Sequence, residues 1–261
     1  MCLSIAGSDS GGGAGIQADL KAFAAAGVHG ATAITAITAQ NTVAVTAVEA
    51  VSPRMIMAQV RAVAEDLGVD AVKVGMVGGV PAIEAVAEAI ALLPQATPVV
   101  VDPVMVAESG ARLLEAEAQA ALVELLLPRA TVVTPNLPEA RALAGDEDET
   151  LKAGELARTV HALGSRLVVV TGGHGEDGSD LFFDGMRLVE IPGERHPDGA
   201  AHGSGCTHSS TLAAALALGE APLQAARIAR EVAGRAVRDG LREVGAGAGP
   251  VDVLGISGRG R

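Results

Sequence analysis

Two glycine-rich segments carry the residue types best suited to chemistry. The first, SDSGGGAG over residues 8–15, follows a short apolar run near the N-terminus. Glycine lets a backbone approach a ligand closely. The segment nevertheless lacks the lysine of a nucleotide-binding P-loop and does not fit the dinucleotide fingerprint. By itself it is equally consistent with a plain connection between a strand and a helix.

The second segment, residues 203–206, places Gly203, Gly205 and Cys206 at the predicted start of a helix. Free backbone N–H groups and the positive end of the helix dipole form a site for an anion. The same field is expected to lower the pKa of the Cys206 thiol. An anion site beside a proton acceptor suits phosphoryl transfer, in which charge must be stabilised and a hydroxyl must lose its proton.

Other roles for this cysteine stay open at the level of sequence. A small apolar residue at a helix start is often simply buried. An acyl-transfer nucleophile would need a histidine base, and His202 and His208 are near in sequence. The same three residues resemble part of a zinc site, but structural zinc usually has four ligands, and no second cluster supplies the rest.

Polar residues also follow most of the predicted strands. In open α/β sheets, ligands bind beyond the carboxyl ends of the strands, so these residues are expected to meet at one edge. Asp102 and Glu139 are candidate ligands of Mg²⁺, directly or through water. Asp102 also fits a turn, and Asn136 and Glu139 also fit a helix cap. The strand-end segments are residues 40–41, 73–76, 102–105, 134–139, 171–174 and 202–207.

Short β-branched runs alternate with stretches of helical period, which predicts a three-layer α/β fold with a mostly parallel sheet. A strand over residues 181–183 and another over 188–191 flank Asp184-Gly185, a two-residue hairpin signal, and predict an antiparallel edge. One domain suffices for residues 1–261. The other predicted strands are 3–7, 71–74, 99–101, 131–133 and 167–170, with extended segments at 31–40 and 43–51; the predicted helices are 14–27, 55–67, 82–93, 115–127, 151–163, 206–218 and 223–239.

Composition narrows the class of protein. The 261 residues include 31 Asp and Glu against 19 Lys and Arg, a formal net charge of −12. Such an acidic chain without a local basic patch is not expected to bind nucleic acid. Its apolar runs are too short for a membrane helix, and its N-terminus lacks the features of a signal peptide. We expect a cytoplasmic protein with two free cysteines, Cys2 and Cys206.

Taken together, these motifs resemble the hydroxymethylpyrimidine/phosphomethylpyrimidine kinases of thiamine biosynthesis, a branch of the ribokinase-like superfamily. The resemblance covers nearly the whole chain. It rests on AGSDSGGGAGIQADLK at residues 6–21, TAQNT at 38–42, KVGM at 73–76, TPNLPEA at 134–140, GGH at 172–174 and HGSGCT at 202–207.

The resemblance implies a kinase that uses ATP and Mg²⁺ twice, first on the hydroxymethyl group and then on the monophosphate. It places the pyrimidine against the residues matching Gly7, Asp19, Gln40 and Met76. It makes Gly203 and Gly205 the anion hole and Cys206 the base. It assigns the nucleotide and its metal to Asp102, Asn136, Glu139, Thr171 and Gly173, and family habit implies a homodimer.

Two places in the sequence, one residue and one pair, depart from the family pattern. Thr171 stands where many members have a lysine, which removes a cationic contact to the phosphates. Ala200-Ala201 replaces a more polar pair before His202. The runner-up activity is a pyridoxal or pyridoxine kinase, which phosphorylates a similar hydroxymethyl heterocycle. A protein that binds a vitamin precursor without catalysis is favoured only if the anion hole or the base is lost.

Overall fold

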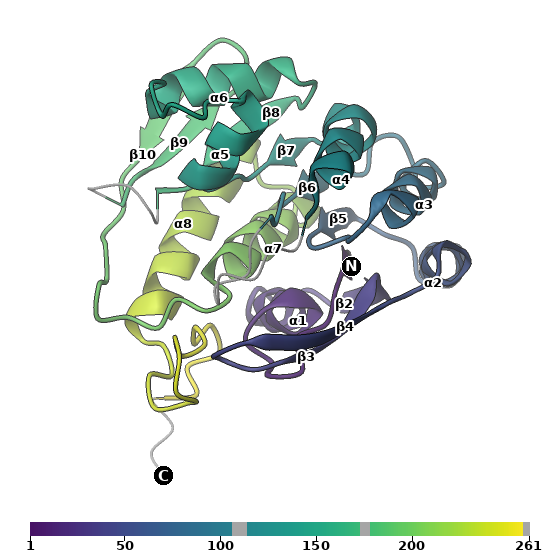
Figure 1. Cartoon of the computed structure of the whole chain (residues 1–261), viewed down its shortest axis with the longest axis horizontal. Helices are drawn as coiled ribbons and strands as arrows, with labels where there is room; N and C mark the ends of the chain where they lie inside the picture. Colours follow the sequence, from purple (N-terminus) through teal and green to yellow (C-terminus); the bar gives the residue numbers. More distant parts are fainter. Residues whose placement is uncertain (106–113, 173–177, 258–261) are drawn as a thin grey trace.

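An eight-stranded sheet forms the centre of the computed structural model, which describes residues 1–105, 114–172 and 178–257 (Figure 1). Its strands are β1 (Cys2–Ala6), β2 (Gly30–Ile34), β5 (Ala71–Val74), β6 (Val99–Val101), β7 (Val132–Val133), β8 (Leu167–Val170), β9 (Asp180–Phe183) and β10 (Leu188–Ile191). They lie in the order β10-β9-β8-β7-β6-β5-β1-β2. Neighbouring strands are parallel from β2 through β1, β5, β6 and β7 to β8. Strand β9 is antiparallel to both of its neighbours, β8 and β10. The predicted sheet with an antiparallel edge is confirmed.

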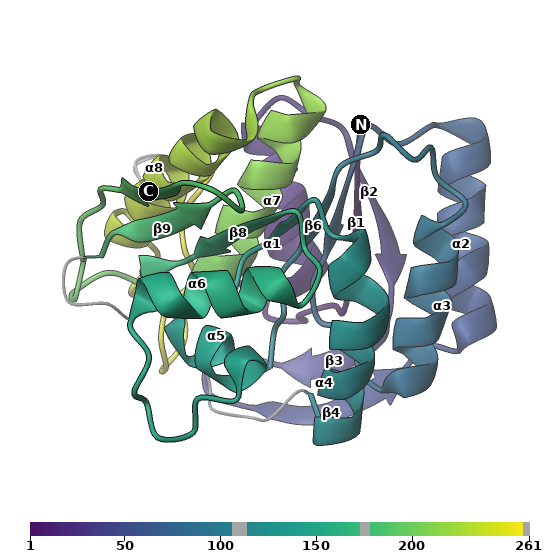
Figure 2. The ribbon, with the colours of Figure 1, turned by 90° about the horizontal axis from the view of Figure 1, so that it is seen from above.

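Helices cover both faces of the sheet, which completes the predicted three layers (Figure 2). One layer holds α1 (Gly15–Ala25), α7 (Ser204–Ala217) and α8 (Pro222–Arg238). The other holds α2 (Pro53–Asp66), α3 (Val80–Ile90), α4 (Ala116–Ala121), α5 (Leu137–Ala144) and α6 (Ala153–Ala162). None of the helices in the described ranges combines the length and apolar character that a membrane crossing needs.

Alternation along the strands explains the two layers. Successive strand residues point to opposite faces. On β5, Val72 and Val74 pack with the layer of α2 to α6, whereas Ala71 packs with the layer of α1, α7 and α8. Both faces of the central strands are apolar because helices cover both. The exception on β5 is Lys73, which is fully buried on the face of α1 and α7.

The extended segment expected over residues 31–40 is two strands in different sheets. Strand β2 ends at Ile34, and β3 (Ala36–Gln40) pairs antiparallel with β4 (Val45–Ala50) in a separate two-stranded sheet. Thr35 lies between them: its amide donates to Ala6, its carbonyl accepts from Val51, and its hydroxyl donates to the carbonyl of Met76. These bonds turn the chain out of the main sheet and carry β3 toward the carboxyl end of β1.

Two further boundaries differ from the sequence prediction. The helix expected over residues 115–127 is α only as far as Ala121, and continues as a wider π turn over Leu122–Leu126. Pro128 explains the change, because it has no N–H to donate to the carbonyl four residues earlier. The hairpin between β9 and β10 has four residues in its loop rather than two. The Asp184 side chain accepts hydrogen bonds from the amides of Met186 and Arg187 and shapes this longer loop.

Candidate active site

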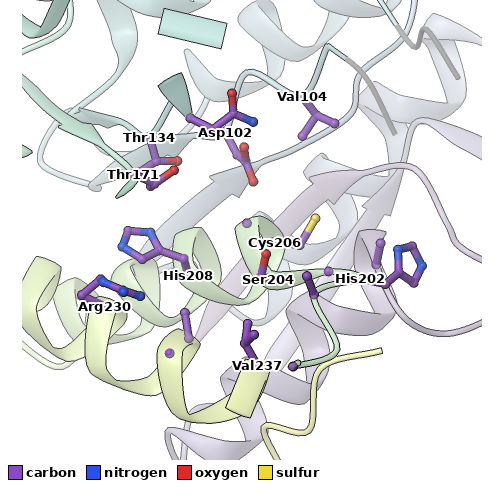
Figure 3. Close-up of a pocket in the computed structure, with 18 of the residues that line it drawn as sticks. Asp102, Val104, Thr134, Thr171, His202, Ser204, Cys206, His208, Arg230 and Val237 are labelled. Atoms are coloured by element: carbon purple, nitrogen blue, oxygen red, sulfur yellow. The ribbon is translucent and has the colours of Figure 1, made fainter. Parts of the chain in front are cut away.

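A cavity of about 420 Å³ lies at the carboxyl ends of the parallel strands (Figure 3). Its volume is in the range of small-molecule sites. Segments from both halves of the chain meet there, as the strand-end argument predicted. Of the residues singled out from the sequence, the lining contains Gly7, Gln40, Met76, Asp102, Asn136, Glu139, Thr171, Gly203, Gly205 and Cys206. Asp19 is not part of the lining, and Gly173 lies outside the described residues.

The start of α7 forms one wall of the cavity. Gly203 has φ +84°, and a Cβ there would lie 1.8 Å from the carbonyl oxygen of Gly13, so this position requires glycine. The amide of Ser204 donates to Ala201, but in the described parts of the chain the amides of Gly205 and Cys206 have no protein acceptor. A Cβ at Gly205 would meet open space. Free amides at the positive end of a helix dipole are an arrangement that can bind an anion.

Cys206 is half-buried beside these amides, but its proton affinity differs from the sequence prediction. Burial raises the pKa of the thiol to about 12, and the charges of Asp19 and Asp102 act in the same direction. Lys73 and a hydrogen bond from the amide of Gly15 favour the thiolate but do not balance these effects. The expectation of a lowered pKa is therefore wrong for the cavity without ligands. The helix dipole lowers the pKa of the thiol by less than burial raises it.

Asp19 lies beneath the cavity and does not face it. Its carboxylate is fully buried and lies 2.8 Å from Nζ of Lys73. The hydroxyls of Ser4 and Ser210 also donate to it. Both carboxylate oxygens therefore already have protein partners, and the ligand contact expected for Asp19 stays a prediction. The structure assigns Asp19 to holding Lys73, whose pKa is raised because Asp19, Cys206 and Asp102 outweigh the opposing effect of burial.

The first glycine-rich segment is organised by Asp9. Its carboxylate accepts hydrogen bonds from the amides of Gly11, Gly13 and Ala14 and lies 2.9 Å from Nε2 of His202. Burial opposes the charge, yet the hydrogen bonds from His202 and these amides hold the pKa of Asp9 below its usual value. Sequence reasoning missed this pair, because the partners are 193 residues apart. It fastens the glycine-rich segment to the residue that precedes Gly203.

Gln40, the last residue of β3, and Met76, which follows β5, both line the cavity. The backbone of Gln40 is held by Ser10, whose hydroxyl accepts from its amide and donates to its carbonyl. Its side-chain oxygen contacts the hydroxyl of Thr38 at 3.2 Å. The Met76 side chain covers Gly7 so closely that a Cβ there would lie 2.2 Å from the methionine methyl. A polar amide and an apolar thioether here suit a small, flat, partly polar ring.

Two carboxylates face the cavity from the ends of β6 and the start of α5. Asp102 accepts a hydrogen bond from Ser209, and burial raises its pKa. Burial and the charge of Asp102 raise the pKa of Glu139 from 4.5 to about 8. Asn136 and Glu139 also form a capping box at the start of α5, so the structural role considered from the sequence is present as well. Two neighbouring buried carboxylates, one of which raises the pKa of the other, are suited to share a cation.

The zinc alternative finds no support in the geometry. Nε2 of His202 faces Asp9 and Nε2 of His208 faces Asp180, each at 2.9 Å, so the two rings do not converge on Cys206. Across the described ranges, no group of three or more His, Cys, Asp or Glu side chains is arranged to hold a metal ion. The same ring orientations leave Cys206 without the histidine base of an acyl-transfer nucleophile.

The far end of the cavity is lined by residues that sequence reasoning did not select. They come from β9, the segment before α7 and one face of α8, where Ala233 and Gly234 leave space. No short motif marks these residues, because their neighbours in space come from separate parts of the chain. The set comprises Gly178, Asp180, Glu194, Arg195, His196, Pro197, Gly199, Arg230, Ala233, Gly234 and Val237.

A three-layer α/β/α fold, with free helix-start amides in the wall of a small-molecule cavity, is the architecture of a phosphotransferase of the ribokinase-like class. The comparisons with known proteins specify the family. Residues 9–252 match the family described as phosphomethylpyrimidine kinase, and the chain belongs to that family.

Named relatives and solved structures agree with this assignment. The chain is 51% identical over 259 residues to the hydroxymethylpyrimidine/phosphomethylpyrimidine kinase of Rhizobium meliloti (strain 1021), with 96% of each chain covered. It resembles the phosphomethylpyrimidine kinase of Clostridium difficile 630 with a TM-score of 0.75 and 37% identity, covering 88% of this chain and 96% of that one. It also resembles an ADP complex of Bacillus subtilis pyridoxal kinase, with a TM-score of 0.87, 38% identity and coverage of 98% and 97%.

We predict that Glu139→Gln stabilises the protein without ligands, and more strongly at higher pH. Between pH 4.5 and about 8 the folded chain retains a proton on Glu139 that the unfolded chain has released. The wild type therefore loses stability as pH rises, by up to ~1.4 kcal/mol per pH unit, whereas glutamine keeps the capping box without this cost. Urea unfolding in a chelator at pH 5 and pH 8 measures the difference, and parallel stability curves would contradict the prediction.

Proposed function

We propose that this enzyme transfers the terminal phosphoryl group of ATP to 4-amino-5-hydroxymethyl-2-methylpyrimidine, and then a second one to the monophosphate, for thiamine biosynthesis. The observation that carries the proposal is the shared cavity. Gln40 and Met76 line one end, and the free amides of Gly205 and Cys206 line the wall beside it. A hydroxymethyl ring and a terminal phosphate can therefore meet in one enclosed space, as phosphoryl transfer requires.

Gly7, Gln40 and Met76 are the proposed pyrimidine contacts. The Gln40 carboxamide supplies a hydrogen-bonding group for the polar edge of the ring, and Met76 packs on its face. Asp19 acts from below by fixing Lys73, whose ammonium group is fully buried beneath the cavity. The wall formed by Gly203, Gly205 and Cys206 then binds the phosphoryl group during transfer.

The nucleotide is proposed to occupy the other end of the cavity. Thr171 and Asn136 line this end and pair with each other through a parallel bridge at adjacent strand ends. Gly173 remains a predicted contact outside the described residues. With threonine at 171, Arg195 and Arg230 supply the positive charge in this lining. Asp102 and Glu139 fit Mg²⁺, which binds to one or two carboxylates together with substrate phosphates and would neutralise the charge on the phosphoryl group.

Cys206 is the proposed acceptor of the hydroxyl proton. Its sulfur lies at the helix start where the substrate hydroxyl and the phosphate must meet, but its raised pKa means that the thiol is protonated in the empty cavity at neutral pH. Most of the rate enhancement in phosphoryl transfer comes from positioning and charge stabilisation. Only the thiolate can accept this proton, so the Cys206 thiol must first lose its own proton to solvent. Lys73 favours the thiolate, and Mg²⁺ held by Asp102 and Glu139 would add positive charge that favours it further.

The pyridoxal kinase activity is the second candidate, because the fold is shared with pyridoxal kinases of Bacillus subtilis and Staphylococcus aureus. The 51% identity to a named hydroxymethylpyrimidine/phosphomethylpyrimidine kinase favours the pyrimidine substrate. A binding protein without catalysis is not favoured, since the free amides and the sulfur are both in place.

The function is tested by analysing products. Incubation with ATP, Mg²⁺ and the hydroxymethylpyrimidine is expected to yield the monophosphate first and the diphosphate later, resolved by anion-exchange chromatography. Parallel reactions with pyridoxine are expected to show a lower kcat/KM. Preference for pyridoxine would establish the second candidate, and no transfer to either substrate would reject the kinase assignment.

Two variants separate binding from transfer. Cys206→Ala is expected to lower kcat by about 10²–10⁴-fold, the usual contribution of a general base, while the Kd for the pyrimidine is retained.

Gln40→Ala is expected to weaken pyrimidine binding by ~1–3 kcal/mol, the cost of an unsatisfied polar partner. Calorimetric titration and steady-state kinetics measure both. Near-normal turnover by Cys206→Ala would remove the thiol from the mechanism, and an unchanged Kd in Gln40→Ala would contradict its contact.

We also propose that the enzyme acts in the cytoplasm as a homodimer. The sheet formed by β3 and β4 exposes Ile37 and Val48, and the turn between the two strands exposes Val43. Each is more than half accessible, on a part of the chain that stands apart from the main sheet. Sedimentation velocity is expected to give the mass of two chains, and Val48→Glu is expected to shift it toward one. A wild-type protein that sediments as a monomer at micromolar concentration would contradict the homodimer.

A further inference from the structure

A buried carboxylate links the two sides of the proposed nucleotide end. Asp180, the first residue of β9, is 1% exposed and lies in the cavity lining. One carboxylate oxygen accepts a hydrogen bond from the amide of Gly172 at 2.8 Å. The other lies 2.9 Å from Nε2 of His208. Since a carboxylate only accepts hydrogen bonds, the histidine donates through Nε2.

Both partners of Asp180 are adjacent to residues of the site. Gly172 directly follows Thr171 at the end of β8, and His208 is on α7, two residues after Cys206. Figure 3 shows the His208 ring extending from α7 toward the side of the cavity where Thr171 lies. Asp180 is therefore a bridge between the strand end and the phosphate-binding helix start.

The histidine depends on this contact for its position. Its other nitrogen, Nδ1, is buried and has no hydrogen-bond partner among the described residues, so Nε2 alone ties the ring to another element. Arg230 of α8 lies near enough to offset the charge of Asp180 but does not hydrogen-bond to it. Its Nε is 3.7 Å from Asp180, beyond hydrogen-bonding distance, and its Nη2 donates to the carbonyl of Glu194.

We propose that Asp180 is a positioning residue for the nucleotide. By holding the Gly172 amide and the His208 ring together, it sets the separation between Thr171 and the amides of Gly205 and Cys206. The proposal rests on the proposed function, because it assumes that a nucleotide occupies this end of the cavity. Asp180 itself need not contact the nucleotide.

Because Asp180 is negatively charged, the direction in which its removal changes ATP binding tests the proposal. A carboxylate in the lining of a cavity that receives a polyphosphate repels it. If the charge were all that mattered, its removal would strengthen ATP binding. If the position of Thr171 and α7 matters more, removal weakens ATP binding although a repulsive charge has gone.

We expect Asp180→Ala to raise the KM for ATP about tenfold and to leave the Kd for the pyrimidine within twofold of the wild type. Asp184→Asn is the matched control, because it removes the same charge from the loop that follows β9, where the carboxylate pairs with Arg187. This control is expected to keep the wild-type KM for ATP. A lowered or unchanged KM for ATP in Asp180→Ala would overturn the proposal.

A second pair of variants keeps Asp180 and guards against a folding defect. Glutamine at 208 can place a donor near the position of Nε2, whereas methionine of similar length cannot. His208→Gln is expected to stay within about threefold of the wild-type KM for ATP, and His208→Met to resemble Asp180→Ala, with circular dichroism showing that both are folded. Equal KM values for the two variants would also overturn the proposal. Wild-type protein without kinase activity would instead refute the proposed function, so the two failures are distinguishable.

Discussion

Asp19 and Lys73 form an ion pair with no exposed surface, and the arrangement of the active site depends on it. Either charge buried alone would cost several kcal/mol, so α1 and β5 must pack in the register that brings the two side chains together. Ser4 and Ser210 extend the contact to β1 and α7. The four elements that surround the floor of the cavity are thus joined by one polar cluster inside an otherwise apolar layer. The start of α7, with its free amides, is held above that cluster.

The same pair explains why Cys206 differs from a cysteine at an exposed helix start. A helix dipole contributes about 0.3–1 kcal/mol at an exposed site. Burial can shift a pKa by several units, and at Cys206 two carboxylates add to the effect. Lys73 acts in the opposite direction and lowers the pKa of the thiol. The pKa of the Cys206 thiol is therefore set first by burial and then by the charges of Lys73, Asp19 and Asp102, and not by the local sequence of the glycine-rich segment.

Much of the fold followed from the sequence because its signals are local. Runs such as Val99–Val101 and the helical periods between them predicted the parallel sheet and its layers, and the strand-end rule gathered most of the cavity lining. Contacts between residues far apart in the chain were not predicted. Nothing local shows that Asp19 meets Lys73, 54 residues away. Asp9 with His202 and Asp180 with His208 were missed for the same reason. At residues 31–40 the turn at Thr35 depends on carbonyls of other strands, which a run of β-branched residues does not reveal.

The contact of α7 with α1 and β1 has a consequence for synthesis on the ribosome. The first 200 residues contain all of the strands that the structure describes, but they leave Phe23 and the polar cluster of Asp19 without the helix that covers them. A nascent chain of that length exposes apolar surface and an incompletely satisfied charge pair, which are features of aggregation-prone intermediates. Only when residues 204–217 have left the exit tunnel can the layer close. Because the site combines residues from both ends of the polypeptide, this surface stays uncovered until translation is nearly complete.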